Sequence, residues 1–235
     1  GRFVATACHD GLLRVWDVAK GQAVQTVKAG AVYEQVLDYD DFHDFEWVAL
    51  ERKHDAWPIE TELQEGWAFP ELNRIDAAKG GAPRAHVDAL RLVAVFLAHW
   101  DNKSENQRLV CQSRDWPDGQ ACATPVMMLQ DLGATFGPRK ISLRRWRVSN
   151  IWADRAQCRI TMRHLPYSGA TFQDVQVGEE GRQLAARLLQ RLSDDDIADL
   201  FRGARFDQRR GLFSDVRPVA DWVAAFKARV RLISE

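Results

Sequence analysis

The sequence predicts an α+β fold, in which a small antiparallel β-element precedes a mainly helical domain with short β-hairpins. Three observations lead to this prediction. Residues 3–27 alternate between apolar and polar side chains, residues 84–99 form one long apolar stretch, and amphipathic stretches begin near residues 178, 195 and 218. Alternation with a period of two is typical of half-buried strands, whereas longer apolar stretches and a 3.6-residue period indicate helices.

The composition is that of an ordinary globular chain with balanced charge. Of the 235 residues 46% are hydrophobic and 28% are charged, and 32 basic against 33 acidic residues give a net charge of -1. Balanced charge provides no general attraction to nucleic acid, so no nucleic-acid partner is expected. No apolar run approaches the roughly 20 residues that a membrane-spanning helix needs, so no membrane span is expected.

The first thirty residues predict three strands, over 3–8, 13–17 and 23–27, separated by turns. Asp-Gly in the first turn readily supplies the positive φ of a tight hairpin. This stretch resembles the last three strands of one WD-repeat blade, and the matching residues are Asp10-Gly11, Val15-Trp16-Asp17 and Gly21. One blade cannot bury both of its faces, so the other blades would lie elsewhere or the element would pack on the next domain. The expected domains are a partial WD-repeat-like element over 1–30 and a second domain over 31–235.

The centre of the chain predicts a buried helix between loops and short strands. A strand is expected over residues 45–52, and Pro58 and Pro70 interrupt regular structure in the segment after it. Residues 84–99 are apolar on nearly every face and follow Pro83, as expected for a buried helix that begins after a proline. Short strands are expected at residues 108–111 and 126–129.

The C-terminal part predicts three helices after an irregular stretch over residues 134–177. The helices are expected at 178–192, at 195–203 and from Pro218 onwards. Ser193 followed by Asp196 is typical of a capping box, in which side chains and backbone N–H groups bond reciprocally.

The residues that indicate chemistry follow the predicted buried helix and the second short strand. They are His99-Trp100-Asp101-Asn102-Lys103-Ser104-Glu105-Asn106 and Asp131-Leu132-Gly133. Phosphoryl transfer needs one carboxylate to orient the attacking hydroxyl and accept its proton, and an amide and a second carboxylate to hold magnesium against the phosphates. Adjacent short strands would hold these groups at fixed positions.

Over residues 60–205 this pattern resembles the C-terminal lobe of protein kinases, including atypical and bacterial kinase-like proteins. The resemblance implies a phosphotransferase in which Asp101 is the catalytic base and Lys103 steadies the transferred phosphoryl group. It implies that Asn106 and Asp131 bind the metal, so that Mg²⁺ and ATP are the expected cofactors. The acceptor would be an unidentified protein or small molecule, and His99 would have a structural role.

Several departures from the kinase pattern leave open whether the protein is catalytically active. Trp100 replaces the usual Arg, Leu132 replaces Phe, and the loop between the short strands is longer. No G-x-G-x-x-G loop and no V-A-I-K strand precede the site, and Lys53 is the only nearby lysine at a strand end. The alternatives are a non-catalytic pseudokinase, or an interaction module associated with the WD-like segment. A fusion of two unrelated fragments near Gly30 is a third interpretation.

The four cysteines are widely spaced and include no C-x-x-C pair. This spacing favours buried or free thiols, with a Cys122–Cys158 disulfide as the alternative in an oxidising compartment. A zinc site on Cys158 and His164 would need two further ligands, for which the sequence offers no good candidates.

A basic cluster follows the Asp131-Leu132-Gly133 segment, and its members are Arg139, Lys140, Arg144, Arg145 and Arg147. The plainer interpretation is a solvated loop. The functional interpretation is recognition of an acidic or phosphorylated partner, because arginine forms paired hydrogen bonds with carboxylates and phosphates.

Overall fold

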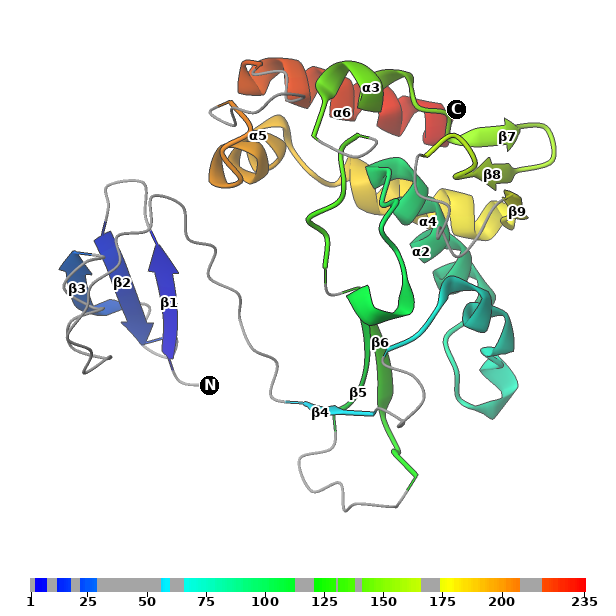
Figure 1. Cartoon of the computed structure of the whole chain (residues 1–235), viewed down its shortest axis with the longest axis horizontal. Helices are drawn as coiled ribbons and strands as arrows, with labels where there is room; N and C mark the ends of the chain where they lie inside the picture. Colours follow the sequence, from blue (N-terminus) through cyan, green and yellow to red (C-terminus); the bar gives the residue numbers. More distant parts are fainter. Residues whose placement is uncertain are drawn as a thin grey trace. The chain divides into compact units, whose positions relative to one another are not determined.

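The computed structural model describes residues 3–7, 12–17, 22–28, 56–59, 66–112, 121–129, 131–137, 141–165, 174–207 and 217–235. The chain divides into two compact units, Gly1–Asp55 and Ala56–Glu235, whereas the sequence pattern suggested a boundary after residue 30. The predicted α+β class is confirmed, because helices and small antiparallel sheets occupy separate segments (Figure 1).

The first unit contains a three-stranded antiparallel sheet. Its strands, in the order β1-β2-β3, are β1 (Phe3–Ala7), β2 (Leu12–Asp17) and β3 (Gln22–Lys28). The pairing of β2 with β3 is irregular between Val15 and Trp16. The three strands agree with the prediction for this stretch. The turn residues Asp10, Gly11 and Gly21 and the strand expected over 45–52 lie outside the described residues, so the WD-repeat resemblance stays a prediction.

The second unit is mainly helical and carries two small sheets, with the orders β4-β5-β6 and β7-β8-β9. Helix α4 contacts both α2 and α6, and α6 also contacts α3 and α5. In chain order the elements are β4 (Trp57–Pro58), the 3-10 helices η1 (Phe69–Arg74) and η2 (Ala77–Lys79), α2 (Arg84–Leu97), the 3-10 helix η3 (Ser104–Asn106), β5 (Gln107–Cys111), β6 (Pro125–Leu129), α3 (Leu143–Val148), β7 (Trp152–Asp154), β8 (Arg159–Thr161), β9 (Asp174–Gln176), α4 (Glu179–Gln190), α5 (Asp194–Gly203) and α6 (Val219–Ser234).

Helix α2 runs through the core, and the candidate site begins just after its C-terminal end. Its apolar residues, including Leu92 and Phe96, are buried, as its almost continuous hydrophobicity predicted. The helix ends at Leu97, before the predicted end at residue 99, because Ala98 adopts the left-handed conformation with φ 55°. The N–H of His99 then donates to the carbonyl of Ala94 at 2.9 Å, so the turn closes the helix.

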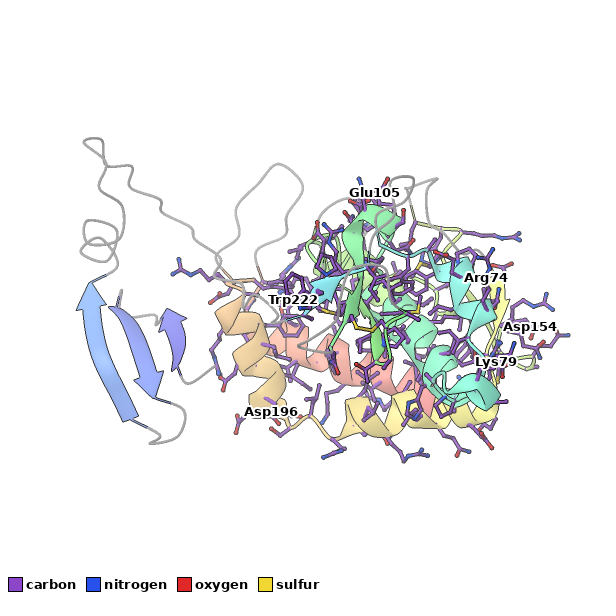
Figure 2. The ribbon with its side chains drawn as sticks, turned by 90° about the horizontal axis from the view of Figure 1, so that it is seen from below. Arg74, Lys79, Glu105, Asp154, Asp196 and Trp222 are labelled. Atoms are coloured by element: carbon purple, nitrogen blue, oxygen red, sulfur yellow. A yellow bond between two sulfur atoms is a disulfide. The ribbon has the colours of Figure 1, made fainter. Side chains whose placement is uncertain are left out.

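An aromatic cluster joins α2, α3, α5 and α6 to the segment after β6. Phe136 is central to it and lies edge-on to Trp146 and Phe206, with ring centroids 5.0 and 5.3 Å away. Such pairs contribute about 0.5–1.5 kcal/mol each beyond the burial of their area. Trp222, labelled in Figure 2, is fully buried in the same cluster. The remaining rings are those of Phe96, Phe201 and Phe226.

Arg229 of α6 is buried and bonds to the last turns of two other helices. Its guanidinium donates to the carbonyls of Trp146 at 2.7 Å, Ser149 at 2.8 Å and Phe96 at 3.2 Å. Helix ends leave carbonyl groups without partners inside the helix, so these bonds stabilise the ends of α2 and α3. Burial lowers the pKa of Arg229 to about 10, which leaves the side chain protonated at neutral pH.

The C-terminal helices agree with the sequence prediction, but the stretch before them does not. Helices α4, α5 and α6 are present, and Ser193 and Asp196 form the expected capping box. Residues 134–177, expected to be irregular, contain α3 and the β7-β8-β9 sheet. These elements have three to six residues each, too few for a periodic pattern to be seen. None of the helices in the described ranges is long and apolar enough to cross a membrane.

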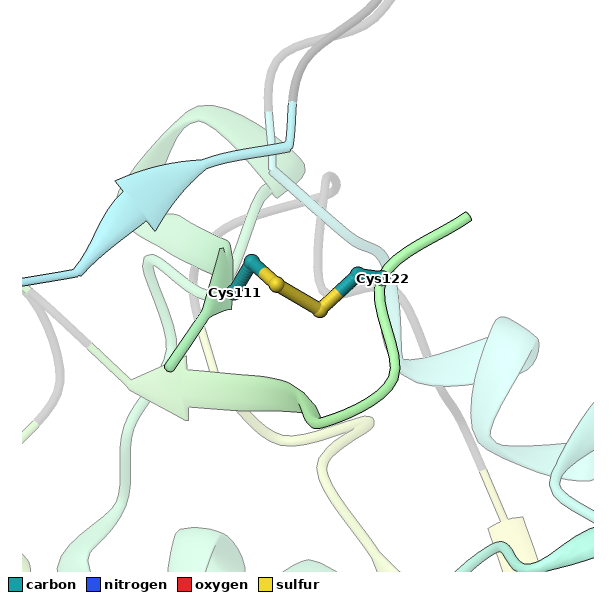
Figure 3. Close-up of a disulfide and its surroundings, with 2 residues drawn as sticks. All are labelled: Cys111 and Cys122. Carbon is teal, nitrogen blue, oxygen red and sulfur yellow. A yellow bond between two sulfur atoms is a disulfide. The ribbon is translucent and has the colours of Figure 1, made fainter. Parts of the chain in front are cut away.

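Cys111 and Cys122 form a disulfide, which corrects the sequence-based expectation (Figure 3). Cys111 ends β5 and pairs with Pro125 at the start of β6, so the antiparallel register brings the two thiols together. The expected free thiols were wrong for these two residues, and so was the alternative pairing of Cys122 with Cys158. Cys158 is free and half-buried in the turn before β8.

Candidate functional site

The four predicted site residues lie in two loops that meet at one end of the β5–β6 hairpin (Figure 1). Residues 98–106 connect α2 to β5, and residues 131–137 follow shortly after β6. Gln107 at the start of β5 pairs with Leu129 at the end of β6. Because the strands are antiparallel, the residue before β5 and the residues after β6 emerge side by side.

Asn106 makes two hydrogen bonds within its own loop and one to the second loop. Its side-chain Nδ2 donates to the carbonyl of Asp101 at 2.7 Å, and its N–H donates to the carbonyl of Lys103 at 3.1 Å. Its own carbonyl accepts a hydrogen bond from the N–H of Asp131 at 3.0 Å. One residue therefore fixes the backbone at all three of the other predicted site positions.

Asp131 begins a tight turn on the surface. Its Oδ1 accepts a hydrogen bond from the N–H of Gly133 at 2.9 Å, the side-chain-to-backbone turn that aspartate favours. Thr135 extends the turn, because its Oγ1 donates to the carbonyl of Leu132 at 2.8 Å. A carboxylate can accept several hydrogen bonds or coordinate a cation with its remaining lone pairs, so Asp131 keeps capacity for a ligand.

Asp101 and Lys103 supply one charge of each sign within the loop before β5. Both side chains are half-buried. In the part of the chain that the structure describes, neither the Asp101 carboxylate nor the Lys103 ammonium group belongs to an ion pair. Both charged groups can therefore interact with a ligand without first breaking an ion pair among these residues.

His99 lies buried beneath this loop. Its Nε2 is 3.4 Å from the side-chain nitrogen of Gln107, which is also buried. Burial lowers the pKa of His99, and the charges of Asp101 and Asp131 oppose that shift. Burial thus favours the neutral form of the imidazole.

Two residues to which the sequence assigned no role also shape the site. Asn102 is buried, and its Nδ2 donates to the carbonyl of His99 at 2.9 Å, which closes the bend after α2. Gly66 packs against the carbonyls of Ser104 and Gln107 with φ +65°. Asparagine after a helix is a usable turn signal. The role of Gly66 depends on distant residues and has no local signal.

Phe136, and not Leu132, attaches the second loop to the core. Leu132, which follows Asp131 in the predicted motif, is 43% exposed. The ring of Phe136 lies in the aromatic cluster, and its N–H donates to the carbonyl of Leu97 at 2.7 Å. The loop that carries Asp131 is thus bonded to the end of α2, immediately before the loop that carries Asp101.

The candidate site residues include oxygen donors of the type that magnesium takes. Across the described ranges, no group of three or more His, Cys, Asp or Glu side chains is placed to hold a metal ion. Magnesium commonly takes only one or two protein ligands and completes its octahedron with water and phosphate oxygens. The Asn106 amide and the Asp131 carboxylate supply oxygen atoms of the type that Mg²⁺ takes, and Nδ2 of Asn106 is the atom bonded to Asp101.

Comparison of the chain with protein-family models, with curated proteins and with solved structures found no match. The motif residues and the geometry of the two loops are therefore the grounds for assigning a function.

Proposed function

We propose that the second unit is a kinase-like phosphotransferase domain that moves a phosphoryl group from Mg²⁺-bound ATP to a hydroxyl acceptor. The observation that carries the proposal is the bonding of Asn106, which ties the Asp101 loop to the N–H of Asp131. Phosphoryl transfer depends mainly on positioning and on stabilisation of charge, so a fixed arrangement of a base, a cation and two metal ligands is its main requirement.

Each site residue has a defined part in this proposal. The acceptor oxygen attacks the γ-phosphorus, the bond from the γ-phosphorus to the bridging oxygen breaks, and ADP leaves. The carboxylate of Asp101 accepts the hydroxyl proton, and the ammonium group of Lys103 offsets negative charge on the transferred group. Asn106 and Asp131 would hold Mg²⁺, which neutralises charge on the phosphates when it is bound.

A non-catalytic pseudokinase is the second candidate, and one observation favours it. The sequence contains no G-x-G-x-x-G loop and no V-A-I-K strand before the site. In kinases these elements cover the phosphates and pair with them. A chain without them can retain the two-loop arrangement as a scaffold for binding other proteins.

Isothermal titration calorimetry with ATP tests the nucleotide site. We expect the wild type to bind ATP in the presence of Mg²⁺ and the Asp131→Asn variant to bind at least about tenfold more weakly, a difference of about 1.4 kcal/mol. Asp195→Asn is the matched control. Asp195 is exposed in the first turn of α5, so this substitution removes the same charge away from the site.

The results separate the two candidate functions. Binding that needs Mg²⁺ and is lost only in Asp131→Asn supports the phosphotransferase site, and transfer from labelled ATP should then fail in Asp101→Asn while binding persists. Absence of ATP binding in a folded wild-type protein would contradict the proposal and favour the pseudokinase.

A further inference from the structure

Helix α3 presents a row of arginines on its outer face. Leu143 and Trp146 point into the core and are buried. The outward residues are Arg144, Arg145, Arg147 and Val148, and together they form what is here called the α3 arginine surface. Three of the six residues of the helix are arginines, although the whole chain has a net charge of only -1. The helix thus carries three positive charges in a chain whose total charge is nearly balanced.

The helix that carries these arginines is firmly anchored. The Nε1–H of buried Trp146 donates to the carbonyl of Phe96 at 2.8 Å. Ser142 caps the start of the helix by accepting from the N–H of Arg145 at 3.4 Å. Arg229 holds the other end through the carbonyls of Trp146 and Ser149. A partner would thus meet side chains on a rigid support, so less ordering would oppose binding.

Arg229 also adds positive charge beneath this surface. In the part of the chain that the structure describes, no carboxylate forms an ion pair with it, and its hydrogen bonds go to neutral carbonyls. Burial lowers the pKa of His164, and the positive charge of Arg229 lowers it further. The charge of Arg229 therefore acts on neighbouring groups. Among the same residues, Arg145 and Arg147 form no ion pairs with acidic side chains. The local field therefore favours a negatively charged partner.

We propose that the α3 arginine surface binds an acidic segment of a partner protein. Guanidinium groups bind carboxylates through paired hydrogen bonds, and Val148, 75% exposed, adds an apolar contact that a peptide can use. A six-residue helix is about 9 Å long, which corresponds to about three residues of an extended peptide. The surface therefore fits a short acidic motif.

The position of α3 gives this surface a role in the proposed reaction. The N–H of Ser142 donates to the carbonyl of Phe136 at 3.0 Å, so the start of α3 is bonded to the loop that carries Asp131. A protein held at α3 would be the phosphoryl acceptor. This assignment of the partner as acceptor rests on the proposed function, whereas binding of the acidic segment does not.

Fluorescence anisotropy with a labelled polyglutamate peptide tests the surface, with no nucleotide present. We expect the wild type to bind the peptide, and the Arg145→Glu/Arg147→Glu variant to bind at least about tenfold more weakly. Arg187→Glu/Arg191→Glu makes the same change in charge on exposed positions at the end of α4 and should leave binding within about twofold. Arg145→Gln/Arg147→Gln replaces the charge-reversed variant if circular dichroism shows that the latter is unfolded.

Equal losses in the α3 and α4 variants, or no loss in the α3 variant, would overturn the proposal. Phosphatidylserine vesicles and single-stranded DNA serve as competing anions. If either binds more tightly than the peptide and loses binding in the same α3 variant, the partner is not an acidic protein segment. The outcome is independent of ATP binding, so failure here and failure of the phosphotransferase proposal can be told apart.

Discussion

Gly66 occupies a position that no larger residue fits. Its φ is +65°, and a Cβ there would lie 2.1 Å from the carbonyl oxygen of Ser104 and 2.3 Å from that of Gln107. Both neighbours are backbone atoms of the turn that carries Asn106, so they cannot move away without changing the site. The glycine is therefore a structural requirement of the loop before β5.

We expect Gly66→Ala to lower the free energy of unfolding by more than about 3 kcal/mol, because it combines backbone strain with a steric clash. Gly80→Ala is the control, since Gly80 has φ +87° but nothing within 4 Å of its added Cβ, and should cost only about 1–2 kcal/mol. Urea denaturation measures both changes. Equal losses of unfolding free energy in the two variants would show that close packing at Gly66 contributes nothing to stability.

At the scale of single residues, the motif predicted that the candidate residues lie at the ends of neighbouring strands, but not which residues support them. The order of Asp101, Asn106 and Asp131 follows from the motif, and the structure brings their backbones together. The exposure of Leu132 and the insertion of Phe136 could not be predicted, because they depend on rings contributed by α3, α5 and α6. Tertiary packing decides which of two nearby apolar residues enters the core.

At the scale of elements, the contact between α2 and α4 depends on Gly181. A Cβ on Gly181 would lie 2.5 Å from the Cβ of Asp88 and 3.1 Å from the carbonyl of Ala85. Asp88 is buried and accepts a hydrogen bond from the N–H of Gly178 at 2.9 Å, just before α4 begins. Arg84 and Arg91 of α2 also bond to its carboxylate. Close approach of the two helices thus allows one carboxylate to hold both.

Alanine normally favours a helix interior over glycine by about 1 kcal/mol. We expect the opposite at this contact, with Gly181→Ala destabilising the protein by about 1–3 kcal/mol, because α4 must move away from α2. Gly203→Ala near the end of α5 meets nothing within 4 Å and should be neutral or stabilising. Thermal denaturation followed by circular dichroism compares the two, and a higher melting temperature for Gly181→Ala would contradict the expectation.

The sequence predicted the long helices well and missed the three-residue strands. Helices α2, α4, α5 and α6 span ten to sixteen residues, which is enough for the apolar period to repeat. The strands β7, β8 and β9 have three residues each and no repeating pattern. Their existence depends on pairing between segments, which local composition does not encode.

At the scale of the whole molecule, the disulfide closes a loop with a sequence separation of 11 residues. A crosslink of this length stabilises the folded state by roughly 3 kcal/mol, by restricting the unfolded chain. We expect dithiothreitol to lower the melting temperature of the wild type accordingly. The oxidised protein is thus expected to be the more stable form in an oxidising environment.

The Cys111→Ser/Cys122→Ser variant should melt near the temperature of the reduced wild type and show no further response to dithiothreitol. Cys158→Ser should respond as the wild type does, because Cys158 is a free thiol. A wild-type melting temperature that does not change on reduction would contradict the expected contribution. Sequence spacing could not identify this pair, because the register of β5 with β6 places the two thiols together.

The bonding of Arg229 has a consequence for synthesis of the protein. Translation produces α2 and α3 before α6, so the carbonyls of Phe96, Trp146 and Ser149 have no guanidinium partner while the chain is growing. The buried rings of Trp222 and Phe226 also arrive late. The second unit therefore cannot complete its core until α6 has left the ribosome. Until then the rings of Phe96 and Trp146 lack their contacts with Phe226, and this apolar surface can aggregate or bind chaperones.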